Sequence, residues 1–154
     1  DDGRLCVFTS ASTDLVVDVA AAVPSDGGLR AVVPARLTET RTGPGDDTVD
    51  GQDEGVGRVA VDSTTVVEVA GRGGVDVDAT GVMLNVAAIR PSTNGFFTVS
   101  PCDAEERPLA ANLNFAPGQV VSNAVFAALS DEGTACLYST AETDLTVDVV
   151  AHLS

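Results

Sequence analysis

Apolar residues alternate with polar ones along most of this chain, and a period of two residues is the pattern of a β-strand with one buried face. Such runs, rich in valine and phenylalanine, occupy residues 14–19, 58–62, 64–69, 82–89, 96–99, 120–129, 136–139 and 144–149. Gly, Pro and Asx turn signals separate them. Roughly ten short strands predict an all-β fold, an antiparallel two-sheet β-sandwich, with a closed β-barrel or trefoil-like arrangement as the alternative.

The charge balance excludes several function classes. The 154 residues carry 23 acidic and 8 basic side chains, for a formal net charge of −15. A surface this acidic repels phosphate groups, so we expect no nucleic-acid partner and no binding to anionic membrane. Membrane insertion is not expected either, since no stretch approaches the ~20 apolar residues needed to span a bilayer. Hydrophobic residues make up 44% of the chain, enough for a packed core.

The two ends of the chain repeat one another. The sequence D-D-G-R-L-C-V-F-T-S-A-S-T-D-L-V-V-D-V-A-A at residues 1–21 matches D-E-G-T-A-C-L-Y-S-T-A-E-T-D-L-T-V-D-V-V-A at residues 131–151, which aligns Cys6 with Cys136. We interpret residues 1–22 as the closing β-hairpin of a preceding repeat unit and residues 23–154 as one complete β-domain. Two alternatives stay open for this hairpin: it associates head-to-tail with another chain by strand addition, or it packs on its own domain.

A second set of motifs carries a resemblance to a known family. The run P-A-R-L-T-E-T-R at residues 34–41 is followed by G-F-F-T-V at 95–99, P-C at 101–102, N-L-N-F at 112–115 and C-L-Y at 136–138. In this order they resemble a repeat domain of secreted actinobacterial proteins that opens with P-x-R-L-x-D-T-R, although Glu39 stands where that motif has Asp. The resemblance implies a secreted or cell-surface module, found alone, in tandem or appended to wall-acting enzymes.

The same resemblance implies a disulfide between Cys102 and Cys136, as expected in an oxidising compartment. Cys6 is then the odd cysteine. It is free, cross-linked to another chain, or a buried thiol.

The sequence contains few residues of the kinds that enzymes use for catalysis. The only histidine is His152, which we interpret as a surface residue, and no serine lies in a G-x-S-x-G motif. Carboxylates are abundant, but aromatic residues, which make up 4% of the chain, are too few to build a sugar-cleaving cleft. We therefore expect no enzyme activity and no cofactor, with structural calcium as the one exception considered below.

Two polar groups are candidate ligand-binding sites. Arg36, Glu39 and Arg41 could clamp an anion or sugar hydroxyls, or form a partly buried ion pair that holds the chain entering the sheet; we favour the ion pair. On a regular strand, Arg36 and Arg41 would point to opposite faces, and Glu39 would share a face with Arg41. The second group is rich in amides, which bind sugars or close turns. It consists of Asn112, Asn114, Gln119 and Asn123.

An acidic loop is the candidate calcium site. Five carboxylates within nine residues could supply oxygen ligands, but their spacing does not follow the EF-hand pattern, so a solvated loop is the competing interpretation. They belong to Asp46, Asp47, Asp50, Asp53 and Glu54.

From these features we expect a non-catalytic extracellular cell-surface module that binds or adheres, through cell-wall or other carbohydrate. The alternative is a structural repeat unit of an extracellular stalk or filament. In that case the chain associates head-to-tail, as a homo-oligomer or with a tandem neighbour, through its N-terminal strands.

Overall fold

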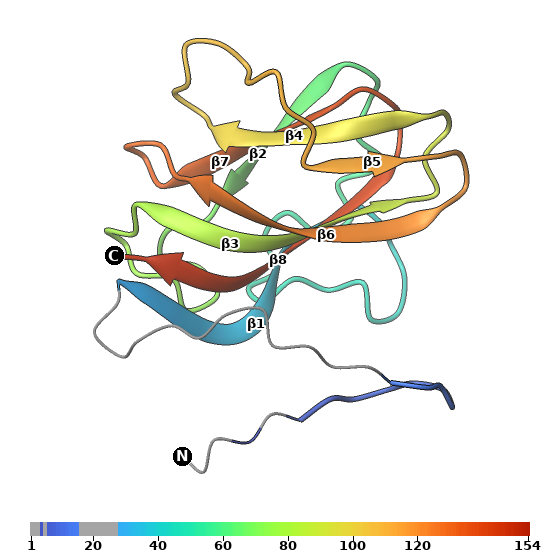
Figure 1. Cartoon of the computed structure of the whole chain (residues 1–154), viewed down its shortest axis with the longest axis horizontal. Coiled ribbons are helices and arrows are strands. Elements are labelled where there is room, and N and C mark those ends of the chain that lie inside the picture. Colours follow the sequence, from blue (N-terminus) through green and yellow to red (C-terminus); the bar gives the residue numbers. More distant parts are fainter. Residues whose placement is uncertain (1–3, 5, 16–27) are drawn as a thin grey trace.

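A computed structural model describes residues 4, 6–15 and 28–154 of the chain (Figure 1). The described residues form eight β-strands in two four-stranded antiparallel sheets, ordered β1-β8-β3-β6 and β2-β7-β4-β5. The sheets face each other as a β-sandwich and do not close into a barrel, which confirms the predicted fold. The strands are β1 (Leu29–Glu39), β2 (Ser63–Glu68), β3 (Gly81–Ile89), β4 (Gly95–Pro101), β5 (Leu113–Phe115), β6 (Val120–Ala128), β7 (Thr134–Ser139) and β8 (Asp144–Leu153).

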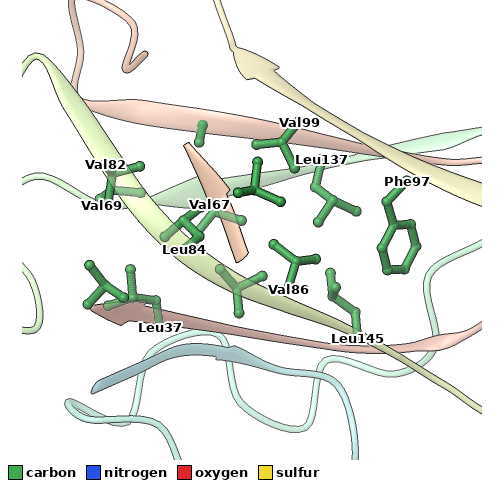
Figure 2. Close-up of a cluster of buried hydrophobic side chains, with 14 of the residues drawn as sticks. Leu37, Val67, Val69, Val82, Leu84, Val86, Phe97, Val99, Leu137 and Leu145 are labelled. Atoms are coloured by element: carbon green, nitrogen blue, oxygen red, sulfur yellow. The ribbon is translucent and has the colours of Figure 1, made fainter. Parts of the chain in front are cut away.

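The core lies between the two sheets and is built by the alternation seen in the sequence. In β8, Leu145, Val147 and Val149 are completely buried, while Asp148 between them is directed to the outer face. Aliphatic side chains from both sheets meet in this layer, together with Phe97 and Phe115; Phe97 is labelled in Figure 2. Burial of these side chains stabilises the sandwich by roughly 1.5–3 kcal/mol each before entropy is counted.

Two of the predicted strands differ in the structure. Residues 58–62 form no strand: Val59 makes one isolated bridge to Thr143, and Asp62 adopts a positive φ of 52° in a turn. Of the predicted strand 14–19, residues 16–19 lie outside the described residues, and Asp14 and Leu15 are not in a strand.

Strand β1 was not among the predicted runs, because its pairing with β8 is interrupted. The register shifts between Ala31 and Ala35 and again between Arg36 and Thr38. Each irregularity inserts residues that break the alternation on which the prediction relied, and Pro34 lies within the first of them.

The C-terminal copy of the repeated segment does not form a hairpin. Strand β7 lies between β2 and β4 in one sheet, whereas β8 lies between β1 and β3 in the other. The segment therefore crosses from sheet to sheet and supplies an interior strand to each. In the N-terminal copy, residues 6–15 contain no strand, and Phe8 is 90% exposed. Residues 1–3, 5 and 16–22 of the predicted hairpin lie outside the described residues.

The predicted disulfide between Cys102 and Cys136 is present and joins the end of β4 to the neighbouring strand β7. Cys6 is an exposed free thiol, so the buried-thiol alternative is wrong. Within the described residues, no helix is long and apolar enough to cross a membrane.

Candidate functional site

The carboxylate of Glu39 is the centre of a buried ion-pair cluster at the end of β1. Its side chain is fully buried and accepts hydrogen bonds from Arg36 Nη1 at 2.8 Å and from Arg41 Nη2 at 2.8 Å. Arg41 donates two more, from its backbone N–H and from Nε, both at 2.9 Å. Burial alone would raise the pKa of Glu39, but the hydrogen bonds and charge of Arg41, with the charge of Arg36, outweigh it and lower that pKa.

This cluster supports the ion-pair interpretation and corrects the expected side-chain directions. Both arginines reach the same carboxylate, although a regular strand would direct them to opposite faces. The register shift between Arg36 and Thr38, and the end of β1 at Glu39, remove the strict alternation. Arg36 also donates from Nε to Asp148 of β8 at 2.8 Å, so the cluster ties β1 to its neighbour.

A second arginine centre, which the sequence did not single out, lies at Arg72. Its side chain is only 7% exposed. It donates to both oxygens of Asp50 at 2.8 Å and to Asp53 Oδ2 at 3.0 Å. It also donates to the backbone carbonyls of Leu37 at 2.9 Å, Glu68 at 3.0 Å and Gln52 at 3.4 Å. The hydrogen bonds from Arg72 lower the pKa of Asp50 to about 2.

The acidic loop is therefore divided between two arginines. Asp46 pairs with Arg41 at 3.0 Å, while Asp50 and Asp53 pair with Arg72. Glu54 accepts a hydrogen bond from the backbone N–H of Thr48, and Asp47 lies beside a hollow next to β1. Within the part of the chain that the structure describes, no three His, Cys, Asp or Glu residues are grouped so that they could hold a metal ion.

The loop also covers part of β1. The backbone N–H of Val49 donates to the carbonyl of Arg36, and the N–H of Glu39 donates to the carbonyl of Asp53, both at 2.9 Å. These bonds satisfy the outer edge of β1 where it approaches the ion-pair cluster.

The four amide residues do not converge on one site. Asn112 Oδ1 accepts from the backbone N–H of Val99 at 2.8 Å, and Asn123 Nδ2 donates to the carbonyl of Asn112 at 2.7 Å. Gln119 Oε1 accepts from the N–H of Ala116 and closes the turn before β6. Asn114 is exposed on β5. Three of the four thus satisfy backbone groups, as expected of turn-forming amides.

An open groove of about 290 Å³ crosses the outer face of the β1-β8-β3-β6 sheet, and we call it the sheet groove. Arg36 and Arg41 line it at the β1 side, Asn85 and Ile89 come from β3, and Ser122 comes from β6. Its volume is near the lower end of the ~300–1,000 Å³ found for small-ligand pockets. The sequence singled out the two arginines, but only the sheet order places β6 residues opposite them.

The charges in and beside the sheet groove compensate one another. Arg36 and Arg41 carry two positive charges, and they pair with the carboxylates of Glu39, Asp148 and Asp46. Asn85, Ser122 and Thr146 add hydrogen-bonding groups that carry no charge. An anion gains no net attraction here, whereas a neutral ligand with hydroxyl groups meets donors, acceptors and apolar surface.

Other hollows are less suited to a polar ligand. A larger one of about 700 Å³ lies beside the irregular part of β1, where Val33 and Val49 are prominent. Another, of about 440 Å³, borders the disulfide. There Arg107 stacks on Tyr138 with its guanidinium carbon 3.8 Å from the ring centroid, and the Tyr138 hydroxyl donates to Asp62. The exposed aromatic face that a sugar would use is thus already covered on one side.

His152 is buried, with 2% of its surface exposed, so the surface interpretation is wrong. Its Nε2 lies 3.4 Å from Asp76 Oδ2, but neither ring nitrogen has a hydrogen-bond partner among the described residues. It does not line the sheet groove.

No known family model and no curated protein matches this chain in sequence comparisons. The class of protein is therefore defined by the structure itself: a disulfide-linked antiparallel β-sandwich with an open polar groove on one sheet.

Proposed function

We propose that this chain is a non-catalytic extracellular module that binds carbohydrate of the cell wall or cell surface through the sheet groove. The observation that carries the proposal is the combination of two charge-compensated arginines, uncharged hydrogen-bonding side chains and apolar side chains in one open groove. Sugar rings present the same mixture of hydroxyl groups and apolar patches. The Cys102–Cys136 disulfide supports an extracellular location.

The ligand that suits this groove is a neutral sugar. The chain has a net charge of −15, and the groove arginines are held by carboxylates, so an acidic polysaccharide would be repelled. The guanidinium groups nevertheless keep fixed positions, since each is hydrogen-bonded to Glu39. They can therefore donate to hydroxyl oxygens with little further loss of side-chain entropy.

The test is calorimetric titration with soluble neutral oligosaccharides and with acidic ones, together with sedimentation on purified peptidoglycan. We expect saturable binding to a neutral glycan that changes little with salt, because no net charge is neutralised. Asn85→Leu keeps the branched shape and the number of heavy atoms but removes the amide from the groove, and should weaken binding about tenfold, the effect of losing one hydrogen bond.

Asn114→Ala is the matched control, since Asn114 is exposed on β5 and outside the groove. It should bind as the unmodified chain does. Absence of saturable binding to every glycan, or equal affinity of the Asn85→Leu variant, would overturn the proposal.

A second candidate function is a structural repeat unit that associates through its N-terminal segment. The observation in its favour is that Val7, Phe8 and Leu15 are 50%, 90% and 57% exposed, an unusual density of uncovered apolar side chains in a short segment. Light scattering after size-exclusion chromatography tests it: Phe8→Asp should abolish self-association, and reductant should do so where Cys6 provides the link.

A further inference from the structure

Strand β6 is an open sheet edge. It is one of the two outermost strands of the β1-β8-β3-β6 sheet (Figure 1), and its pairing with β3 runs from Val120 to Ala128 without a register shift. Among the described residues, backbone hydrogen bonds outside the β3 ladder do not involve residues 120–128. The N–H and C=O groups on its outer side are therefore available to another strand.

The other sheet edges are protected. Strand β1 has two register shifts and contains Pro34. It is also partly covered by the acidic loop, in which the backbone N–H of Val49 donates a hydrogen bond to the carbonyl of Arg36. Strand β5 has three residues, and β2 has six, flanked by Asp62 and ending in Glu68. Bulges, proline, charge and short length are the devices that prevent edge-to-edge pairing. Strand β6 has none of them.

The composition of β6 favours contact with another strand. Its sequence, V-V-S-N-A-V-F-A-A, has no charged residue in a chain of net charge −15. Val120 and Phe126 are 68% and 58% exposed. The residues that pair with Ser122, Ala124 and Phe126 on β3 are also uncharged: they are Ala87, Asn85 and Met83.

We propose that β6 pairs with β6 of a second copy of this chain, antiparallel about a two-fold axis through Ala124, so that two sheets join into one of eight strands. This register pairs all nine residues, with Val120 opposite Ala128 and Ser122 opposite Phe126. The second copy fits because its edge strand is equally uncharged, so the pairing of the two strands brings no carboxylates into contact. The two-fold symmetry closes the assembly at a dimer.

The dimer has a consequence for the sheet groove, and this consequence alone rests on the proposed function. Val120, Val121 and Ser122 line the groove, so each groove lies beside the interface. The two-fold axis of an antiparallel pair is perpendicular to the sheet, which places both grooves on the same face. A polymeric glycan could then engage both sites and gain avidity.

Analytical ultracentrifugation of the full chain over a range of concentrations tests the interface. We expect a monomer–dimer equilibrium. Ala124→Lys places two ammonium groups opposite each other at the axis and should weaken dimerisation at least tenfold. Val77→Lys adds the same charge at an exposed position outside β6 and should leave the equilibrium unchanged. Circular dichroism and thermal melting show whether the Ala124→Lys variant stays folded.

Cross-linking provides a second measurement that does not depend on the lysine variant. With Cys6→Ser to remove the free thiol, Ala124→Cys should form an intermolecular disulfide across the axis, and Val77→Cys should not. A monomer at all concentrations would overturn the proposal. So would a dimer that persists in Ala124→Lys and disappears in Phe8→Asp, which would assign association to the N-terminal segment. Neither result would affect glycan binding by the monomer.

Discussion

Arg72 and Asp50 form a two-pronged ion pair: Nε and Nη2 of the arginine each donate to a different oxygen of the carboxylate, both at 2.8 Å. The two residues are 22 positions apart, and the pair fixes the acidic loop against the turn that follows β2. The guanidinium is buried and also reaches the carbonyls of Leu37 and Glu68, so it joins loop, edge strand and turn.

Arg72→Met should lower the free energy of unfolding by about 3 kcal/mol, because the buried carbonyl of Leu37 and the partly buried carbonyl of Glu68 lose a charged donor while the carboxylates can still reach water. Arg72→Lys should lose less, since it keeps the charge but not the planar fork. Urea denaturation with an unchanged m-value measures both. If the Met variant were as stable as the unmodified chain, the hydrogen bonds of Arg72 would make no net contribution to the free energy of unfolding.

Acid should weaken the same contact. Arg72 lowers the pKa of Asp50 to about 2 from 3.8, so the carboxylate is preferentially ionised in the folded state. Its contribution is fully present above the unfolded pKa and is lost as pH falls through the folded one, between about pH 4 and pH 2. Asp50→Asn should flatten the stability profile in that window, as followed by denaturant unfolding at each pH. A profile that is unchanged by this substitution would contradict the assignment.

Glu39→Gln should destabilise the fold by about 3 kcal/mol, since it leaves Arg36 and Arg41 without their shared buried carboxylate. Glu39→Asp is the matched control: it keeps the charge on a shorter side chain and should cost less. Thermal and urea unfolding of the two variants compare them directly. If the Asp variant is the less stable of the two, chain length rather than charge governs the cluster.

Replacing Cys102 and Cys136 together by alanine should lower the free energy of unfolding by about 3–4 kcal/mol in the chain-entropy model, since the bond closes a loop with a sequence separation of 34. Cys6→Ser should have no such effect, because Cys6 is an exposed free thiol. Denaturant titrations of both proteins, with and without reductant, provide the comparison. A loss in the Cys6→Ser protein would mean that this thiol takes part in folding.

Regular strands were predictable because one face of each is buried. The alternation in β8 and β3 identifies the core residues Leu145, Val147, Leu84 and Val86 directly. Strand β1 was not predicted, because its two register shifts interrupt the alternation of apolar residues. Residues 58–62 were wrongly predicted as a strand, because the apolar alternation there ends in a turn at Asp62. The local pattern of apolar residues indicates which side of a strand is buried, but it does not show whether a neighbouring strand is present to pair with it.

The candidate site was predictable only in part. The P-A-R-L-T-E-T-R run marked Arg36, Glu39 and Arg41, which the structure does bring together. Arg72 carried no local signal, since its partners lie 19 and 22 residues away. Nor could the sequence show that Ser122 lies across the groove from Arg36, because that depends on the order of four strands.

The fold class and the net charge both follow from the amino-acid sequence, the fold class through the period of its apolar residues. The disulfide between Cys102 and Cys136 was expected only from a resemblance, and the structure contains this bond. Three features depend on the tertiary structure: β7 and β8 belong to different sheets, three of the five loop carboxylates are divided between two arginines, and β6 is left as an open edge. The physical reason is that alternation and charge are local quantities, whereas strand order and ion pairing depend on contacts between residues far apart in the chain.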